Sequence, residues 1–191
     1  MSQQNINSFF KISTSDDNSI QQQQPPPQQP TQSKKLSIFM RDSDLPPEDV
    51  YNLYFDGCCK GNPGEAGAGA VIYKNGREIW FGSMYVGEFK TNNIAEYTGL
   101  LMGLNQAISY GIKKINIKGD SQLVIKQMTG EYKVNSEKLK EYNTLARKLV
   151  KQFSRVSYEH VYREYNRRAD NLSNQGLEKN PKYILHCNSS I

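Results

Sequence analysis

Four carboxylate residues of this 191-residue chain could together bind divalent metal, because each lies at the end of a predicted structural element. They are Asp56, Glu96, Asp120 and Asp170. Four carboxylates held close together repel one another unless cations compensate their charge. An oxygen-rich cluster of this kind suits hard divalent ions such as Mg²⁺. If the fold gathers the four acids, the chemistry that fits them is phosphodiester hydrolysis by two metal ions.

Each of these acids also has an ordinary structural explanation. Glu96, three residues after Asn93, could complete a helix capping box, and Asp120 could be the N-cap of a short helix. Asp56 could belong to the turn after a strand, and Asp170 could form a surface ion pair with the two arginines before it. Each explanation is reasonable for one acid, but four such coincidences are improbable, so we favour a shared site.

An alternation of strands and helices must position these acids. The pattern predicts strands at 50–57, 68–74 and 77–85, a helix at 93–109, a strand at 113–119, a short helix opened by Asp120, a helix at 136–152, a strand at 154–162 and a helix at 166–178. We expect a Gly/Pro-rich loop, KGNPGEAG, after the first strand and a tight hairpin turn at KNG. The order βββαβααβα predicts an α/β fold with a mixed five-stranded sheet and helices on its faces.

Charge and composition divide the chain into a tail and one domain. Residues 1–50 hold four Lys/Arg and six Asp/Glu, whereas residues 51–191 hold 20 and 13. The basic domain suggests a polyanionic partner, although a well-solvated basic surface is the alternative. A Gln/Pro-rich composition predicts a disordered tether at 12–48, followed by a domain at 49–180 and a tail at 181–191. No apolar run of 18 residues occurs, so we expect no membrane association.

The phrases around the four acids closely resemble type I ribonuclease H over residues 50–178. They read DGCCKGNPG, TNNIAEY, GDSQLVIKQ and NRRADNL, in the order of that family. The resemblance implies a ribonuclease H-like fold and an endonuclease that hydrolyses the RNA strand of RNA–DNA hybrids, leaving 5′-phosphate and 3′-hydroxyl ends. It also implies two Mg²⁺ ions, or Mn²⁺: Asp56 would bridge both, Glu96 and Asp120 would complete one, and Asp170 would help to hold the other. We expect a monomer.

Substrate contacts follow from the same resemblance. The family positions that contact 2′-hydroxyls in the minor groove correspond to Cys59, Gly61, Asn62, Asn93 and Gln122. The positions that grip a phosphate of the DNA strand correspond to Thr91 and Asn92. An ordinary turn is the alternative reading of the Asn-Pro-Gly segment. Double-stranded RNA or an RNA–DNA junction as substrate, and a non-catalytic adaptor that only binds hybrids, also remain open.

Two departures make this chain similar to the compact, handle-free form of the family. The segment MTGEYKVNSEK replaces the long basic extension that grips the hybrid in many bacterial members. A basic helix face could do part of that work, or could simply be solvated; it comprises Lys140, Arg147, Lys148 and Lys151. Many members also have a mobile histidine before the last acid. His160 falls within the predicted strand, so we expect it to be structural and favour Arg163, at the strand end, as the charged catalytic assistant.

A short peptide at the N-terminus resembles the motif that binds the eukaryotic sliding clamp, proliferating cell nuclear antigen. In residues 1–11 the motif residues are Gln3, Ile6, Phe9 and Phe10. One helical turn would place the aliphatic and aromatic side chains on one side, as a plug for a hydrophobic pocket. Chance within a Gln/Asn-rich segment is the alternative. The motif predicts recruitment to replicating DNA in the nucleus, with the cytoplasm as a further location.

Overall fold

Five strands form one mixed sheet in the computed structural model, which describes residues 48–178. The sheet order is β3-β2-β1-β4-β5. The elements are β1 (Tyr51–Gly61), β2 (Gly64–Lys74), β3 (Arg77–Lys90), α1 (Asn92–Ser109), β4 (Lys114–Gly119), α2 (Gln122–Thr129), α3 (Glu137–Val150), β5 (Arg155–His160), the short 3₁₀ helix η3 (Arg163–Tyr165) and α4 (Arg167–Gly176). The predicted α/β fold class and the element order βββαβααβα are confirmed.

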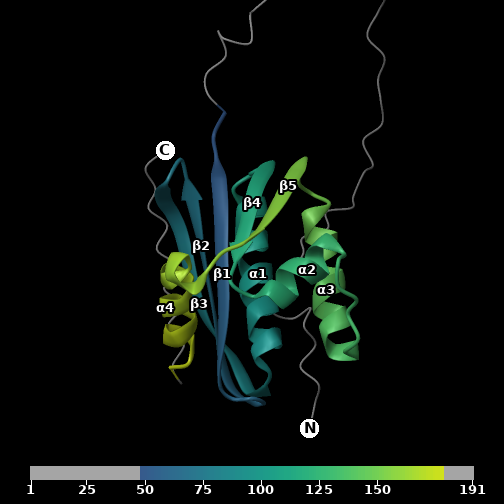
Figure 1. The fold of residues 1–191 in the computed structure, drawn as a ribbon. Coiled ribbons are helices and arrows are strands. Elements are labelled where there is room, and N and C mark those ends of the chain that lie inside the picture. Colours follow the sequence, from purple (N-terminus) through teal and green to yellow (C-terminus); the bar gives the residue numbers. More distant parts are fainter. Residues whose placement is uncertain (1–47, 179–191) are drawn as a thin grey trace, which may run out of the picture. The chain divides into compact units, whose positions relative to one another are not determined.

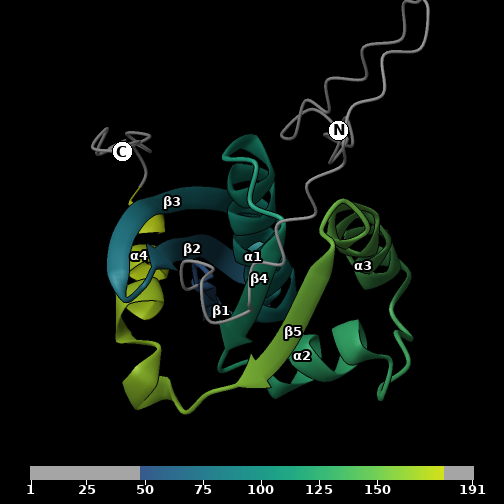
Figure 2. The ribbon, with the colours of Figure 1, turned by 90° about the horizontal axis from the view of Figure 1, so that it is seen from above.

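The sheet combines a meander with two parallel crossovers. Strands β1, β2 and β3 are antiparallel neighbours, whereas β4 runs parallel to β1 and β5 runs parallel to β4. Figures 1 and 2 show α4 on one face of the sheet and α1 on the other, with α2 and α3 on the side of α1. Because the parallel strands end at the same edge, residues that follow them meet there.

The predicted Gly/Pro-rich loop after the first strand is wrong, because β1 and β2 continue through it and leave only Asn62 and Pro63 as the turn. Two glycines of β2 allow close packing against α4: a Cβ on Gly67, within this segment, or on Gly69, just after it, would lie 2.2 or 2.4 Å from backbone atoms of Ser173. The predicted hairpin turn at KNG is correct, since both central residues have positive φ, as a type I′ turn requires.

Helix starts also differ in detail from the predictions. Thr91 caps α1, and Ser121 caps α2 by accepting from the backbone of Val124. Asp120 therefore does not open α2, because the hydroxyl of the next residue satisfies the free N–H. The predicted last helix is present as α4, and the short helix η3, which was not predicted, lies just before it, with Asn166 between the two.

Several predictions concern parts of the chain outside residues 48–178. The clamp-binding peptide at 1–11, the C-terminal tail at 181–191 and nearly all of the tether at 12–48 lie outside the described residues. Within the described part of the chain, no helix is both long and apolar enough to span a membrane.

Candidate active site

Three of the four predicted acids meet at one place on the sheet. A carboxylate oxygen from each of Asp56, Glu96 and Asp120 lies within 4.8 Å of the other two. Asp56 lies within β1 rather than at its end, because that strand is longer than expected, and Asp120 directly follows β4. The neighbouring pair Phe55 and Gly119 are register partners, so the two aspartates lie side by side.

Glu96 reaches this pair because α1 touches β1 through its backbone. A Cβ on Gly57 would lie 2.1 Å from the backbone nitrogen of Glu96. One turn later, a Cβ on Gly99 would lie 2.7 Å from the carbonyl oxygen of Asp56. The capping-box explanation for Glu96 is wrong, since Thr91 caps the helix and the glutamate is only 5% exposed.

We expect Gly57→Ala to separate β1 from α1 at the site. The added methyl meets backbone atoms that cannot rotate away, so the free energy of unfolding should fall by about 3 kcal/mol. The acid triad should be disrupted as well, because Glu96 moves away from Asp56. Chemical denaturation measures the first effect, with Gly76→Asn as control: that position is open and has a φ that asparagine tolerates. Wild-type stability for Gly57→Ala would contradict the close contact.

Burial and mutual repulsion raise the pKa values of two of the acids. Burial, with the nearby Asp120 and Asp170 charges, raises the pKa of Asp56 to about 7, despite the opposing hydrogen bond from Ser173. Burial first, and then the Asp56 and Asp120 charges, raise the pKa of Glu96 well above its usual value. The cluster is therefore unfavourable in its fully ionised form without cations.

The donor set fits a hard divalent cation. Glu96 Oε1 accepts a 3.4 Å hydrogen bond from Asn92, but its Oε2 is buried and has no hydrogen-bond partner among residues 48–178. A buried carboxylate oxygen without a donor is costly, and a cation would satisfy it. Carboxylate-only ligand sets suit Mg²⁺ or Mn²⁺ rather than softer metals. The identity of the ion stays a prediction.

Asp170 lies beside this triad and is held by other contacts. Its Oδ1 accepts from Arg163 Nη2 at 2.5 Å, and this hydrogen bond raises the pKa of the guanidinium. Ser173 bridges the two acids, since its Oγ lies 2.5 Å from Asp56 Oδ2 and 2.9 Å from the backbone oxygen of Asp170. The ion-pair explanation proposed for Asp170 from its preceding arginines is wrong: Arg168 pairs with Glu78.

Asn166 and Ser173 belong to the site but were not predicted from the sequence. The amide Nδ2 of Asn166 donates to Asp120 Oδ1 at 2.8 Å and to Phe55 O at 2.9 Å, and the residue is 1% exposed. One amide thus ties Asp120 to the strand that carries Asp56. From the sequence, Asn166 resembles an ordinary helix cap, but in the structure its side chain forms no capping bond.

His160 and Arg163 lie on either side of a bend. His160 is the last residue of β5, as the strand prediction expected, and its Nε2 lies 3.1 Å from Asp120 O. Arg163 lies in η3 rather than at the strand end, and its side chain contacts Asp170. The arginine is therefore the charged side chain of this segment that reaches an acid of the site.

Most of the predicted hybrid-contact residues lie at the β1–β2 turn and at the start of α1. The turn residue Asn62 accepts a 3.2 Å hydrogen bond from the backbone of Asn92, and Cys59 Sγ donates to Lys90 O at 3.0 Å. These bonds join the β1–β2 turn to the start of α1, which also holds the remaining predicted residues Thr91 and Asn93. Gly61 ends β1, and Gln122 opens α2 after Asp120.

The basic face predicted on α3 is smaller than expected. Arg147 donates to Asn143 Oδ1 at 3.0 Å and to Gln127 O at 2.7 Å, so it joins α3 to α2. Lys140 pairs with Glu137 on its own helix. Only Lys148 and Lys151 of the predicted set have no such contact recorded in the described part of the chain.

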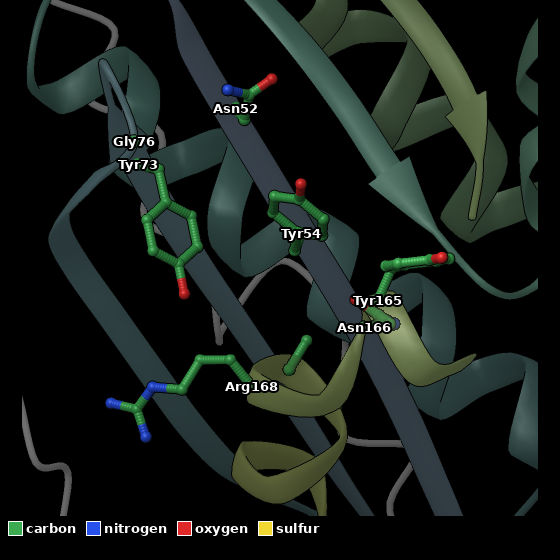
Figure 3. A pocket seen from close by; sticks show the side chains of 8 residues that line it. Asn52, Tyr54, Tyr73, Gly76, Tyr165, Asn166 and Arg168 are labelled. Carbon is green, nitrogen blue, oxygen red and sulfur yellow. The ribbon is translucent and has the colours of Figure 1, made fainter. Parts of the chain in front are cut away.

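A cavity of about 250 Å³ lies on the α4 face of the sheet (Figure 3). Its lining comprises Asn52, Tyr54, Tyr73, Gly76, Tyr165, Asn166, Arg168 and Ala169. Arg168 makes two 3.0 Å hydrogen bonds to Glu78, so its charge is already neutralised. The acids of the triad are absent from this lining: Asp56 and Glu96 are 5% exposed, and Asp120 is partly exposed.

Comparisons with known proteins agree with this geometry. A protein-family profile described as "Reverse transcriptase-like" matches residues 54–176. Ribonuclease HI of Halobacterium salinarum is 41% identical over 128 residues, which are 66% of this chain and 64% of that protein, so this chain spans under two thirds of that relative.

Two solved structures are also similar. The crystal structure of RNase H1 from Halobacterium salinarum NRC-1 has a TM-score of 0.66 and 39% identity, covering 69% of this chain and 99% of that one. LC11-RNase H1 in complex with an RNA/DNA hybrid has a TM-score of 0.64 and 36% identity, covering 68% of this chain and 97% of that one. With its sheet order, its acid triad and these matches, the chain belongs to the ribonuclease H family.

Proposed function

We propose that this protein is a metal-dependent endoribonuclease that hydrolyses the RNA strand of RNA–DNA hybrids. The observation that carries the proposal is the triad of Asp56, Glu96 and Asp120, with one buried glutamate oxygen that lacks a donor. A carboxylate cluster that is unfavourable without cations suits metal-dependent catalysis on a phosphodiester backbone. The products would be 5′-phosphate and 3′-hydroxyl ends.

The four acids would hold two Mg²⁺ or Mn²⁺ ions, which when bound activate water and stabilise the leaving 3′-oxygen. The chain's own residues supply the arrangement. Asn166 orients Asp120, and Ser173 holds Asp56 through its hydroxyl. Asp170 is kept beside the triad by Arg163. Such contacts behind ligating carboxylates set their orientation and so the affinity of the site.

The hybrid is the substrate we favour because two lines of support coincide. The similar LC11-RNase H1 was solved in complex with an RNA/DNA hybrid. In this chain, two of the predicted contact residues are joined, since the backbone N–H of Asn92 at the start of α1 donates to Asn62 in the β1–β2 turn. Minor-groove contacts of this kind detect 2′-hydroxyls on one strand.

A single cleavage assay tests the proposal. Labelled RNA–DNA hybrid, double-stranded RNA, an RNA–DNA junction and DNA duplex are incubated with the full chain and Mg²⁺ or Mn²⁺. We expect cleavage of the RNA strand of the hybrid above all others. Preferred cleavage of double-stranded RNA or of the junction would show that the proposed substrate is wrong, but it would support the proposed active site. No cleavage of any duplex with either metal would overturn the enzyme proposal.

Arg163 should assist catalysis by holding the side chain of Asp170 in position. Because its side chain is 76% exposed, the ion pair contributes little to stability. We expect Arg163→Gln to lower kcat by about 10- to 100-fold, the usual effect of losing a partner behind a metal ligand, with unchanged thermal unfolding. Arg163→Lys should recover part of the loss. Unchanged kcat for Arg163→Gln would remove this residue from the mechanism.

The N-terminal motif supports a further part of the proposal, recruitment to the sliding clamp in the nucleus. Phe9 and Phe10 with Ile6 form an apolar set in a segment otherwise poor in apolar residues. Tethering would raise the local nuclease concentration near replicating DNA without a new contact at the active site.

Exchange of both phenylalanines for alanine tests the motif. We expect a peptide of residues 1–11 to bind immobilised clamp with micromolar affinity, and the Phe9→Ala, Phe10→Ala peptide to lose at least 10-fold, because the aromatic anchors fill the pocket. Hybrid cleavage by the full chain with these two changes should be normal in the absence of clamp. Equal binding by both peptides would contradict the motif.

A further inference from the structure

Phe89 is an apolar side chain displayed to solvent beside the predicted substrate edge. It is 81% exposed, the highest value among the large hydrophobic residues of the described chain. The exposed tyrosines elsewhere, such as Tyr132 and Tyr162, carry a hydroxyl that water can solvate. A bare phenyl ring has no such group, so its exposure needs a separate explanation.

The backbone at Phe89 has an unusual conformation that directs the ring outward. Its φ is 53°, in the left-handed region that a bulky residue rarely adopts. In the pairing of β2 with β3, Gly64 opposes Lys90 and Ala66 opposes Gly87, so Glu88 and Phe89 together oppose one residue. This is a β-bulge, a device that re-aims a side chain next to functional sites.

Neighbouring contacts hold the bulge in place. Lys90, the next residue, accepts from Cys59 Sγ at 3.0 Å through its backbone oxygen. Two residues on, Thr91 caps α1 by accepting from Ile94 N at 3.4 Å. Both bonds are made by residues that directly follow Phe89, and they attach this segment to β1 and to α1. Hydrogen bonds therefore hold the backbone next to the exposed ring.

Charged side chains of both signs lie near Phe89. Glu88 precedes it and Lys90 follows it, and the exposed Lys60 at the end of β1 is the register partner of Glu65. The two lysines can attract phosphates, and an aromatic ring beside them can pack on sugars and bases, as in other contacts to nucleic acid. Charge alone would not need the phenyl group.

We infer that Phe89 is a substrate-contact residue, whose ring packs in the minor groove of the bound duplex beside the phosphate predicted to lie at Thr91 and Asn92. The inference rests on the proposed function, because it takes the duplex as the ligand. An apolar ring gains by leaving water against sugar and base edges. The unfavourable φ of Phe89 is then the conformational strain required to direct its ring toward the duplex.

Two substitutions separate the ring from the backbone. Phe89→Asn removes the ring but tolerates the left-handed backbone, so it should keep or raise the free energy of unfolding. It should raise the KM for hybrid and the dissociation constant in fluorescence anisotropy by about 5- to 100-fold, the range for loss of an aromatic contact to nucleic acid. kcat should be unchanged, because the contact is equal in ground and transition states. Phe89→Trp keeps an aromatic ring and should retain near wild-type KM.

Tyr132→Asn provides the matched control, since it removes an exposed ring between α2 and α3 and introduces the same residue. We expect no change in its KM. Unchanged KM and binding for Phe89→Asn would overturn the inference. An equal loss of hybrid affinity in Phe89→Trp would also overturn it, because the backbone rather than the aromatic ring would then be responsible. If the wild-type protein cleaves no duplex but fluorescence anisotropy shows that Phe89→Asn weakens duplex binding, the proposed function is wrong and the Phe89 contact is supported.

Discussion

Asp56→Asn and Asp120→Asn should each lower the rate of hybrid cleavage by about 10³-fold or more while the domain stays folded. Each change removes the negative charge of a side chain in the triad and keeps its shape. Metal ions supply several kcal/mol of transition-state stabilisation, and each 1.36 kcal/mol corresponds to one decade in rate. Single-turnover cleavage of a labelled hybrid at saturating enzyme measures the loss free of binding effects.

The matched control is a surface acid outside the site. Glu137→Gln removes a carboxylate from the first turn of α3, where the side chain is 84% exposed. This variant should cleave at the wild-type rate, and circular dichroism should show that all three variants are folded. A wild-type rate for Asp56→Asn would mean that the triad is not the catalytic site.

The metal-free protein should lose stability as the pH rises from about 4 to about 7, and divalent cations should restore it. Asp56 has a folded-state pKa of about 7 because burial and its acidic neighbours disfavour the charged form, whereas the unfolded chain titrates near 3.8. The folded state therefore binds more protons than the unfolded state in this interval. The stabilising contribution is complete below pH 4 and is lost as pH passes 7. Glu96 acts in the same direction.

Asp56→Asn isolates this contribution, because it removes the titrating group and leaves all others. In EDTA at pH 8 the variant should exceed the wild type in unfolding free energy by about 2–4 kcal/mol, and the difference should vanish at pH 4. Adding Mg²⁺ at pH 8 should stabilise the wild type much more than the variant. Equal denaturation curves for both proteins in EDTA at pH 8 would contradict the repulsive cluster.

Much of this architecture could be predicted because the local signals agree with the global fold. The alternation of elements, the KNG turn and the placement of Asp120 after β4 all follow from residues near one another in the sequence. The loop after β1 was mispredicted for a physical reason. Gly67 looks like a loop residue, but its missing side chain is needed where α4 rests on the sheet.

The supporting contacts of the site could not be predicted, because they join residues far apart in sequence. Asn166 reaches Asp120 across 46 residues, and Ser173 reaches Asp56 across 117. The periodicity of apolar residues predicts helices and strands but not contacts between such distant residues. Arg163 illustrates the same limit: its charge suggested a role, but only the bend after β5 shows that Asp170 is its partner.

The backbone contact of α1 with β1 at Gly57 and Gly99 has a consequence for how this protein can change over evolution. Main-chain atoms, which every sequence shares, set the separation between the strand acid and the helix acid. The apolar residues around them can therefore be exchanged without altering the spacing on which metal binding depends. Substitutions in the core therefore leave the spacing of the acids unchanged, whereas a side chain at Gly57 or Gly99 would alter it.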